Sequence, residues 1–480
     1  MCAWYQKYSD KLLGKQKELE TAASPGVAVR RRRVTLGLDF GTSTSKCCFR
    51  EETEGKPFVF ADFAGPDGNG SSPLFDTAVA MCDRRLLFGP DARKAAEVIR
   101  SFKMCLLCQA QPKAAMTRSG NCPRCSSVLP GTYDIGGTTV SAEDLCTLHL
   151  SVMLSEVLPR IPAAVGVDAA RLRIHINSAA PLDQLRDFGS VGPYFERSVY
   201  YALRLAESGK PRRVWLMKDA MEALAAVRQQ PKPAGADSPT ALFPETHAAM
   251  TGFLLLPERE RGLYGLVDVG AGTTDISFFW LQKNENDTRV WYYATGTTPK
   301  GMDDVDRALA PILNEPADRL RAKRESMGTD WVSRNSSTFS EVSNAIEKHL
   351  KSVYWTAHDL DQRRGAWIDN KRTAQFRLFL VGGGAMCAPL VDKIRKFLPR
   401  DTRWGVQPSR LLVPANVSVL SPSGVMRSLK DAGFQDARSL LLLAYGLAHP
   451  RPDVPKYERD REGVVVEKRE IPGRTHEDIY

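Results

Sequence analysis

Two short turns in this sequence carry residue types that can hold a chain of phosphates. The first reads DFGTST over residues 39–44 and the second reads DVGAGTT over residues 268–274, so both begin with Asp, any residue and Gly. Backbone N–H and hydroxyl groups in such turns donate hydrogen bonds to phosphate oxygens, and the glycines let the backbone come close. Because a carboxylate repels a phosphate, Asp39 and Asp268 would need a divalent cation beside them, most simply a hydrated Mg²⁺.

Four cysteines have the spacing of a zinc ribbon. Cys105 and Cys108 form one CxxC pair, and Cys122 and Cys125 form a second pair after thirteen intervening residues. Each CxxC turn directs two thiolates toward one point, and four thiolates satisfy a tetrahedral Zn²⁺. We therefore expect a structural zinc, with redox-active or unligated thiols as the alternative.

Apolar strands must present both phosphate turns. VTLGLDF and KCCFRE flank the first turn, and GLYGLVDVG and DISFFWL flank the second, which predicts two β-hairpins. Either turn alone is typical of an ordinary hairpin, but the pair suggests two related lobes that face each other. Further strands are expected at Thr77–Met81, Arg171–Ser178, Val290–Thr295 and Phe376–Val381. Helices are expected at Ser141–Leu158, Val191–Ala206, Ser340–Asp359 and Ala437–Ala448, the first with a capping box of Ser141 and Asp144.

Composition narrows the class of protein. A chain of 480 residues, 43% of them hydrophobic, can bury large cores. The ten cysteines are too sparse for a disulfide scaffold. The net charge of +10 is partly concentrated in the run 30–33 of four arginines, which could touch nucleic acid or an acidic partner, although a solvated arm is the commoner explanation. We find no signal-peptide pattern and no long apolar run, so we expect a cytoplasmic protein without membrane contact.

At these motifs the chain resembles the actin/Hsp70/sugar-kinase superfamily, and most closely the nucleotide-binding half of an Hsp70 chaperone. GLDFGTSTSKCCF (37–49) is similar to the first phosphate motif of that family, and GLVDVGAGTTDISFF (265–279) is similar to the second. LFLVGGGAMCAPLVDKI (378–394) resembles the adenosine motif, and AYGLA follows near the end. The three motifs occur in the family's order, and the resemblance extends over residues 34–448.

The resemblance implies an α/β, two-lobed actin-like (ribonuclease H-like) ATPase fold with a four-Cys zinc ribbon inserted in the first lobe. The implied organisation is an N-terminal basic arm (1–32), lobe I (33–260) with the ribbon at 101–130, lobe II (261–430), a helix returning to lobe I (431–448) and a charged tail (449–480).

Further matches favour Hsp70 within the superfamily. IRSFKMCL is similar to the segment in which Hsp70 carries a lysine over the γ-phosphate, which implies that role for Lys103. FPETHAAMTGFL resembles the segment with the catalytic glutamate, and the match falls on Glu245. Here Pro244 precedes the glutamate rather than following it, so the loop geometry stays open.

By this resemblance the cofactors are ATP or ADP, Mg²⁺ and Zn²⁺. Asp39 and Asp268 would hold magnesium through its waters, and Asp275 would steady that shell. Glu245 and Asp268 would orient the attacking water, and Lys103 would balance negative charge. The implied nucleotide contacts are Asp39, Gly41, Thr42, Ser43, Thr44, Gly270, Ala271, Gly272, Thr273, Gly301 of the KGMDD turn, and Gly382, Gly383 and Gly384.

The tail after Ala448 is too short for the peptide-binding domain of Hsp70. We therefore expect a slow ATPase that acts as a nucleotide-dependent switch for a protein partner, in a chaperone-like or other multi-protein system. The alternatives are a filament-forming actin-like protein, a small-molecule kinase of the same superfamily and, least favoured, a scaffold that does not hydrolyse nucleotide.

Overall fold

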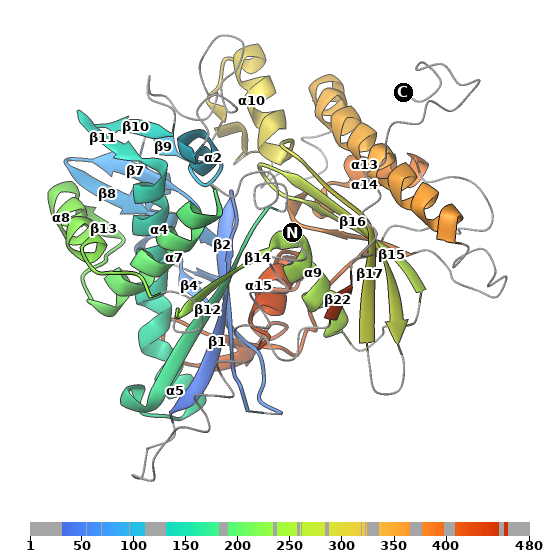
Figure 1. Ribbon diagram of the computed structural model, residues 1–480. Coiled ribbons are helices and arrows are strands. Elements are labelled where there is room, and N and C mark those ends of the chain that lie inside the picture. Colours follow the sequence, from blue (N-terminus) through green and yellow to red (C-terminus); the bar gives the residue numbers. More distant parts are fainter. Residues whose placement is uncertain are drawn as a thin grey trace.

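The protein, described here from a computed structural model, is a mixed α/β molecule with several sheets (Figure 1). The structure describes residues 31–450 and 456–458, except for residues 54, 69, 96, 111–130, 182–190, 234–237, 257–259, 261, 284–287, 318, 322, 324–335, 365–376 and 398–408. The arm before residue 31, most of the tail, and Cys122 and Cys125 therefore lie outside the described residues.

The first large sheet has the strand order β14-β12-β1-β2-β3-β20-β21, with β6 paired to β2. Its strands are β1 (Arg32–Phe40), β2 (Thr44–Glu51), β3 (Val59–Ala61), β6 (Phe75–Asp76), β12 (Leu172–Ala180), β14 (Thr240–Pro244), β20 (Ser418–Leu420) and β21 (Met426–Ser428). β1 and β2 form the predicted antiparallel hairpin, and β1 pairs in parallel with β12 on its other side. β1 is buried from Val34 onward because elements cover both of its faces, as its largely apolar sequence indicates.

The second large sheet repeats this arrangement. Its order is β19-β18-β15-β16-β17-β22, from β15 (Gly262–Val269), β16 (Thr274–Lys283), β17 (Thr288–Thr298), β18 (Arg377–Val381), β19 (Ser409–Arg410) and β22 (Lys456–Glu458). β15 and β16 form an antiparallel hairpin, and β18 pairs in parallel with β15. In each sheet, therefore, a glycine turn joins a central strand to its antiparallel neighbour.

A four-stranded sheet with the order β13-β8-β7-β9 lies beside the first large sheet (Figure 1). Its strands are β7 (Val79–Cys82), β8 (Arg85–Phe88), β9 (Val98–Ile99) and β13 (Val214–Leu216), and the short pairs β4 (Phe63–Ala64) with β5 (Ser71–Ser72) and β10 (Thr132–Ile135) with β11 (Thr138–Ser141) accompany it. A 3-10 helix, η2 (Gly89–Lys94), follows β8.

Helices α4 (Ala142–Val157) and α7 (Gly192–Glu207) pack against each other in the first hydrophobic core. The predicted capping box of α4 is confirmed, since the Ser141 hydroxyl accepts from Asp144 N and the Asp144 carboxylate accepts from Ser141 N. The remaining helices of this half are α2 (Cys105–Ala110), α5 (Ile161–Val165) and α8 (Met217–Arg228).

Helices α9 (Glu245–Leu254) and α15 (Leu442–Leu447) lie between the two large sheets (Figure 1). Their core cluster draws side chains from both sheets, for example Phe60 from β3 and Tyr264 from β15. Glycine allows the close approach: a Cβ on Gly37 of β1 would lie 2.3 Å from the carbonyl oxygen of Ala444 in α15. A short 3-10 helix, η7 (Asp436–Leu440), precedes α15, so the predicted helix at 437–448 is divided in two.

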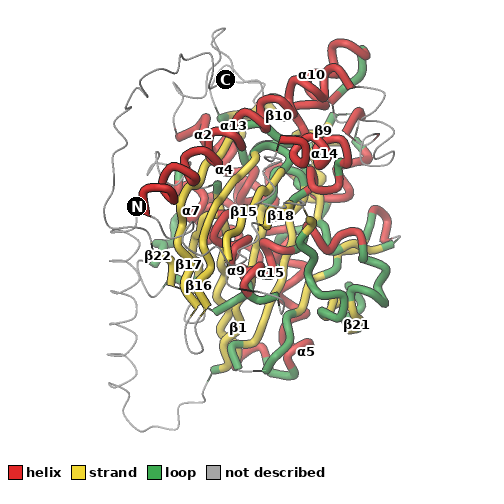
Figure 2. The backbone as a smooth tube through the Cα atoms, turned by 90° about the vertical axis from the view of Figure 1, so that its right-hand side faces the viewer, coloured by secondary structure: helices red, strands yellow, loops and turns green. Residues whose placement is uncertain are grey.

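Three helices cover the other face of the second sheet (Figures 1 and 2). α10 (Met302–Leu313), α13 (Ser336–Arg364) and α14 (Ala388–Phe397) share a core cluster with β15, β16 and β18. α13 comes close to β17, where a Cβ on Gly296 would lie 2.8 Å from Val353.

The chain returns to the first sheet earlier than the expected boundary at 431. β20 pairs in parallel with β3, so Ser418–Leu420 belongs to the first sheet although the sequence assigned it to the second lobe. The reason is that β3 pairs along one edge with a strand that is distant in the sequence. No local sequence pattern predicts such a long-range pairing.

One helical stretch among the described residues, Ala142–Val165, has the length and composition of a membrane span. Half of its apolar window is buried inside the molecule, and α4 lies in the first core. Core helices commonly have such a composition, so the stretch lends little support to a membrane location.

Candidate functional site

A cavity of about 570 Å³ lies where the two glycine turns meet. Residues of the first turn (Asp39 to Thr44) and of the second (Asp268 to Thr273) both line it. The turns face each other closely: a Cβ on Gly272 would lie 3.1 Å from Thr42 Oγ1 and 3.0 Å from Met104 Cγ. Two segments that are more than two hundred residues apart in the chain therefore share one site.

Hydrogen bonds hold the first turn from the side of β6. The Thr77 hydroxyl donates to Gly41 O at 2.8 Å, and Thr77 N donates to Ser43 O at 2.9 Å. The turn is also tight, since a Cβ on Gly41 would lie 2.4 Å from Thr44 O. Glycine is therefore required at position 41 by close backbone contact.

The second turn is joined to the start of α10. Gly270 N donates to Thr273 O within the turn, and the backbone N–H groups of Met302 and Asp303 donate to Gly270 O and Ala271 O at 3.1 and 2.9 Å. A Cβ on Gly301 would lie 2.3 Å from Ala271 O, so only glycine fits there. The KGMDD segment thus supports the second turn from behind, and of its five residues only Met302 lines the cavity.

Two buried ion pairs stand in the cavity wall. Lys103 Nζ lies 2.5 Å from Glu245 Oε1, with 3% and 9% of these side chains exposed. Lys46 Nζ lies 2.9 Å from Asp39 Oδ2. Burial opposes the charge of Lys103, but the attraction and hydrogen bond of Glu245, with Asp39 and Asp275 nearby, outweigh it, so the pKa of Lys103 lies above its usual value. Lys103 is therefore a cation at neutral pH.

The surroundings of Asp268 oppose the ionisation of its carboxyl group. Burial and the negative charges of Glu245 and Asp39 raise the pKa of Asp268 to about 7, and Lys46 and Lys103 oppose the shift. Three carboxylates face two ammonium groups here, so a bound cation would favour the ionised form of Asp268. The site thus fits a cation in its charge and in the oxygen chemistry of its donors.

A glycine next to Asp268 makes room for the carboxylate. Gly382 has φ of +77°, and a Cβ there would lie 2.3 Å from Asp268 Oδ1. The glycine run after β18 therefore leaves an open cradle beside the second turn, as a site for a ligand's polar groups requires.

Thirteen of the residues predicted for the site line the cavity: Asp39, Gly41, Thr42, Ser43, Thr44, Lys103, Glu245, Asp268, Gly270, Ala271, Thr273, Gly382 and Gly383. Gly272, Gly301 and Gly384 lie just behind its wall. Asp275 is buried opposite Asp268 in the β15–β16 ladder, accepts a hydrogen bond from Thr297 Oγ1 at 2.6 Å and does not line the cavity.

Pro244 explains how Glu245 reaches the site. β14 pairs with β12 through Pro244, which is the N-cap of α9, and Glu245 is the first residue of that helix. A carboxylate in the first turn of a helix is stabilised by the helix dipole. The altered order of Pro and Glu is thus compatible with a Glu245 side chain in the cavity wall.

Sequence reasoning missed three charged residues of the wall. Lys46 follows the first turn on β2, and Asp76 and Arg93 form an ion pair of 2.6 Å in a different part of the wall. The position of Lys46, two residues after the turn on the same strand, was a signal that could have been used, because alternate strand residues share a face. The pairing of Asp76 with Arg93 had no local signal.

Cys105 and Cys108 lie one turn apart on α2 and are buried in the first core. Their expected partners, Cys122 and Cys125, lie outside the described residues. Within the described part of the chain, no three His, Cys, Asp or Glu side chains are grouped closely enough to ligate a metal directly.

No protein-family model matches this chain, and no curated protein matches it at a significant level.

Proposed function

We propose that this protein binds Mg²⁺-ATP between its two large sheets and hydrolyses it slowly. The observation that carries the proposal is the shared cavity of the two aspartate-headed turns. Residues of the two turns, which carry backbone N–H groups and hydroxyls, line one space from separate sheets, together with the buried Lys103–Glu245 pair. Such a set of donors suits a polyphosphate that is held from two sides.

We also propose that the fold is the two-lobed actin/Hsp70 type. Each large sheet has a hairpin whose first strand pairs in parallel with a later strand, and each hairpin turn is a proposed phosphate loop. The central helices α9 and α15 contact both halves through one core cluster. These features support related halves on either side of a nucleotide cleft.

The proposed chemistry depends mainly on positioning. Magnesium would neutralise phosphate charge, with Asp39 and Asp268 as the carboxylates nearest to it. Glu245 accepts a hydrogen bond from Lys103 and would orient a water for attack, while Lys103 and Lys46 would balance the negative charge that builds up on the phosphate oxygens. Asp275 does not line the cavity, so it would act through β15 and β16 and through its attraction for the Lys103 ammonium.

A ligand that contacts both turns would link the two sheets, and this supports the proposed role as a switch. Its release would remove that link and so change the surface seen by a protein partner. We further propose that Cys105 and Cys108, with Cys122 and Cys125, bind a structural zinc. The cysteines on α2 begin two residues after Lys103, so the zinc would stabilise the helix that follows a proposed catalytic residue.

Calorimetric titration with Mg²⁺-ATP and Mg²⁺-ADP tests the proposal, with Asp268→Asn as the variant that removes a turn carboxylate. We expect saturable binding by the parent protein that depends on magnesium and is weakened in the variant. Absence of nucleotide binding at millimolar concentration would exclude the proposed function.

A second candidate, a small-molecule kinase, is favoured by one observation. The cavity continues past the turns along Phe63 to Pro66, Leu74 and Pro90, where a phosphoryl acceptor would find apolar walls and the Asp76–Arg93 pair. ADP release that rises severalfold with an added sugar or acid would favour the kinase. Sedimentation with ATP separates either function from an actin-like filament.

A further inference from the structure

Part of the cavity wall is built from three short segments that contain no phosphate turn. They are the β4 segment with the residues after it (63–66), β6 with Asp76, and η2 with Pro90 and Arg93. Asp76 pairs with Thr44 in the β2–β6 ladder, so its partner Arg93 is held one strand away from the first turn. The position of these segments therefore determines where the Arg93 guanidinium lies in the cavity wall.

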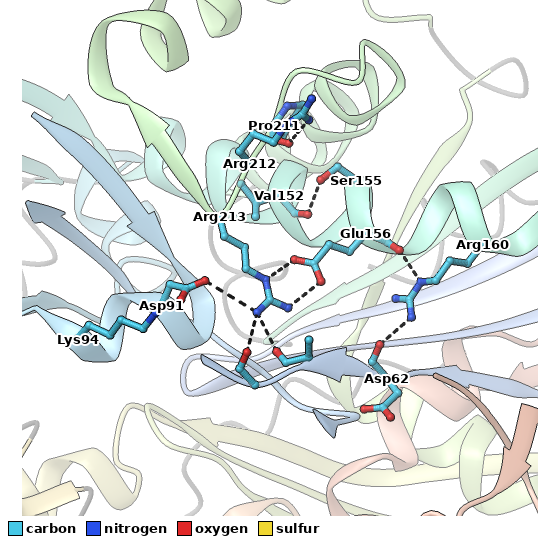
Figure 3. A network of polar contacts seen from close by, with 12 residues as sticks. Asp62, Asp91, Lys94, Val152, Ser155, Glu156, Arg160, Pro211, Arg212 and Arg213 are labelled. Atoms are coloured by element: carbon cyan, nitrogen blue, oxygen red, sulfur yellow. Dashed lines mark hydrogen bonds and ion pairs between the residues drawn. The ribbon is translucent and has the colours of Figure 1, made fainter. Parts of the chain in front are cut away.

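Arg213, just before β13, contacts all three segments, although it does not itself line the cavity. Figure 3 shows Arg213 between Asp91 of η2 and Glu156 of α4. Its Nη1 donates to Ala64 O at 2.8 Å and to Gly65 O at 3.4 Å, and it lies 3.9 Å from Asp91 Oδ2 of η2. Its guanidinium also lies 5.6 Å from the centre of the Phe75 ring, beside Asp76. Each contact is with a wall residue or with the neighbour of one.

The guanidinium is anchored on the buried helix α4. Arg213 Nε and Nη2 donate to the two carboxylate oxygens of Glu156 at 2.5 and 2.8 Å. The backbone contributes as well, because Phe88 N, just before η2, donates to Arg213 O at 2.8 Å. Only 16% of the Arg213 side chain is exposed.

A lysine could not reproduce these contacts. The planar guanidinium has five N–H donors in a fixed fork, so it can bind a carboxylate with two of them and a carbonyl with another. A lysine ammonium has only one nitrogen, so it cannot donate to the carboxylate and to the backbone carbonyl in these positions at the same time. The arrangement therefore depends on arginine geometry and not only on charge.

We propose that Arg213 is a positioning residue for the cavity: it fixes the wall that carries Asp76 and Arg93 and thereby controls how tightly a ligand's anionic end is held beside the first turn. The ligand part of this inference rests on the proposed nucleotide binding. The positioning part rests only on the contacts of Arg213.

A matched control exists on the same helix. Arg197 of α7 donates from Nε and Nη2 to both oxygens of Glu143 on α4, at 2.8 and 3.1 Å. Neither Arg197 nor Glu143 lines the cavity. Arg197→Lys thus removes an equivalent fork without touching the wall, and it measures what a merely structural arginine contributes.

Hydrogen exchange tests the positioning role without any ligand. We expect Arg213→Lys to speed amide exchange in peptides that cover 63–66 and 89–94 by about tenfold, and Arg197→Lys to leave both unchanged. Glu156→Gln, which keeps Arg213 but weakens its anchor, should give a smaller change in the same peptides. Equal exchange in the Arg213→Lys variant and the parent would overturn the proposal.

A double-variant cycle tests the ligand role. If Arg213 acts through Arg93, Arg213→Lys should weaken Mg²⁺-ATP binding about tenfold in the parent but less than about twofold in an Arg93→Gln background. The turnover rate at saturating nucleotide should stay within about twofold, because Lys103 and Glu245 are untouched. Equal losses in both backgrounds would overturn the coupling to Arg93. If the parent binds no nucleotide, the proposed function fails and the exchange rates alone decide on Arg213.

Discussion

At the scale of single residues, the site combines groups whose charges depend on one another. Lys103 remains charged although it is buried, because Glu245, Asp39 and Asp275 are close, and Asp268 is difficult to ionise because it is buried beside Glu245 and Asp39. The resemblance to Hsp70 pointed to Lys103 and Glu245 separately, and the structure brings them into contact. Lys46 was missed because the pairing partner of a strand lysine depends on the fold.

The raised pKa of Asp268 predicts a pH-dependent stability. Because the folded protein holds a proton on Asp268 that the unfolded chain releases near pH 4, this group makes folding less favourable as pH rises from about 4 to about 7. Asp268→Asn removes the penalty, so its stability advantage over the parent should grow across this range, toward ~4 kcal/mol at most, and stay constant above it. Urea unfolding of the parent and of Asp268→Asn at pH 5 and pH 8 measures this difference in unfolding free energy. A difference that shrinks as pH rises would contradict a raised pKa of Asp268.

Removing Lys103 should separate catalysis from binding. In Lys103→Ala the turns still offer their N–H groups, so nucleotide affinity should change less than about fivefold while turnover falls at least about a hundredfold. The variant also leaves Glu245 buried without its ion pair, at a cost of ~3 kcal/mol. Lys103→Ala/Glu245→Gln should recover part of that stability but no turnover. Unchanged hydrolysis in Lys103→Ala would remove this lysine from the mechanism.

At the scale of elements, local signals predicted the local structure well. The two hairpins, the capping box of α4 and helices α7 and α13 follow from strand alternation, capping residues and helical periodicity. The pairing of β20 with β3 and the contacts of Arg213 with the cavity wall could not be predicted, because they join segments that are more than a hundred residues apart.

The contact between β1 and α15 should be sensitive to a single methyl group. A Cβ on Gly37 would meet backbone atoms of Ala444 and Ala448 at 2.3 and 2.4 Å, and backbone cannot yield as a side chain does. Gly37→Ala should therefore cost ~3 kcal/mol of unfolding free energy. Gly262, also in a strand, has space for a Cβ, so Gly262→Ala is the control and should change stability by under ~1 kcal/mol. Similar melting curves for the two variants would show that the junction is looser than described.

The zinc proposal predicts a measurable metal content. Cys122→Ser should lower bound zinc from one equivalent to a small fraction and destabilise α2, because three thiolates bind zinc much more weakly than four. Cys82→Ser is a suitable control, since Cys82 is exposed and stands outside both CxxC pairs. Plasma emission spectroscopy measures the zinc bound per protein in both variants. Equal zinc content in the two variants would refute the proposed four-cysteine zinc site.

At the scale of the whole molecule, the repeated hairpin arrangement allows one ligand to be gripped from two sheets. If Mg²⁺-ATP bridges the turns, X-ray scattering should give a smaller radius of gyration with ATP than with ADP or no ligand. Gly270→Val, which crowds the second turn, should abolish this difference in radius of gyration while the protein stays folded. An identical scattering profile in all three states would argue against a nucleotide-dependent switch.

The close backbone contacts of α15 also affect how the two halves can move. Leu443 of this helix lines the cavity, while its backbone rests on β1 at Gly37 and on α9 through Gly252 and Gly446. If the two halves move, we therefore expect them to rotate about this contact, because backbone atoms so close together cannot be compressed further. Small adjustments beside a ligand would then be amplified at the outer rims of the sheets, far from where the ligand is bound.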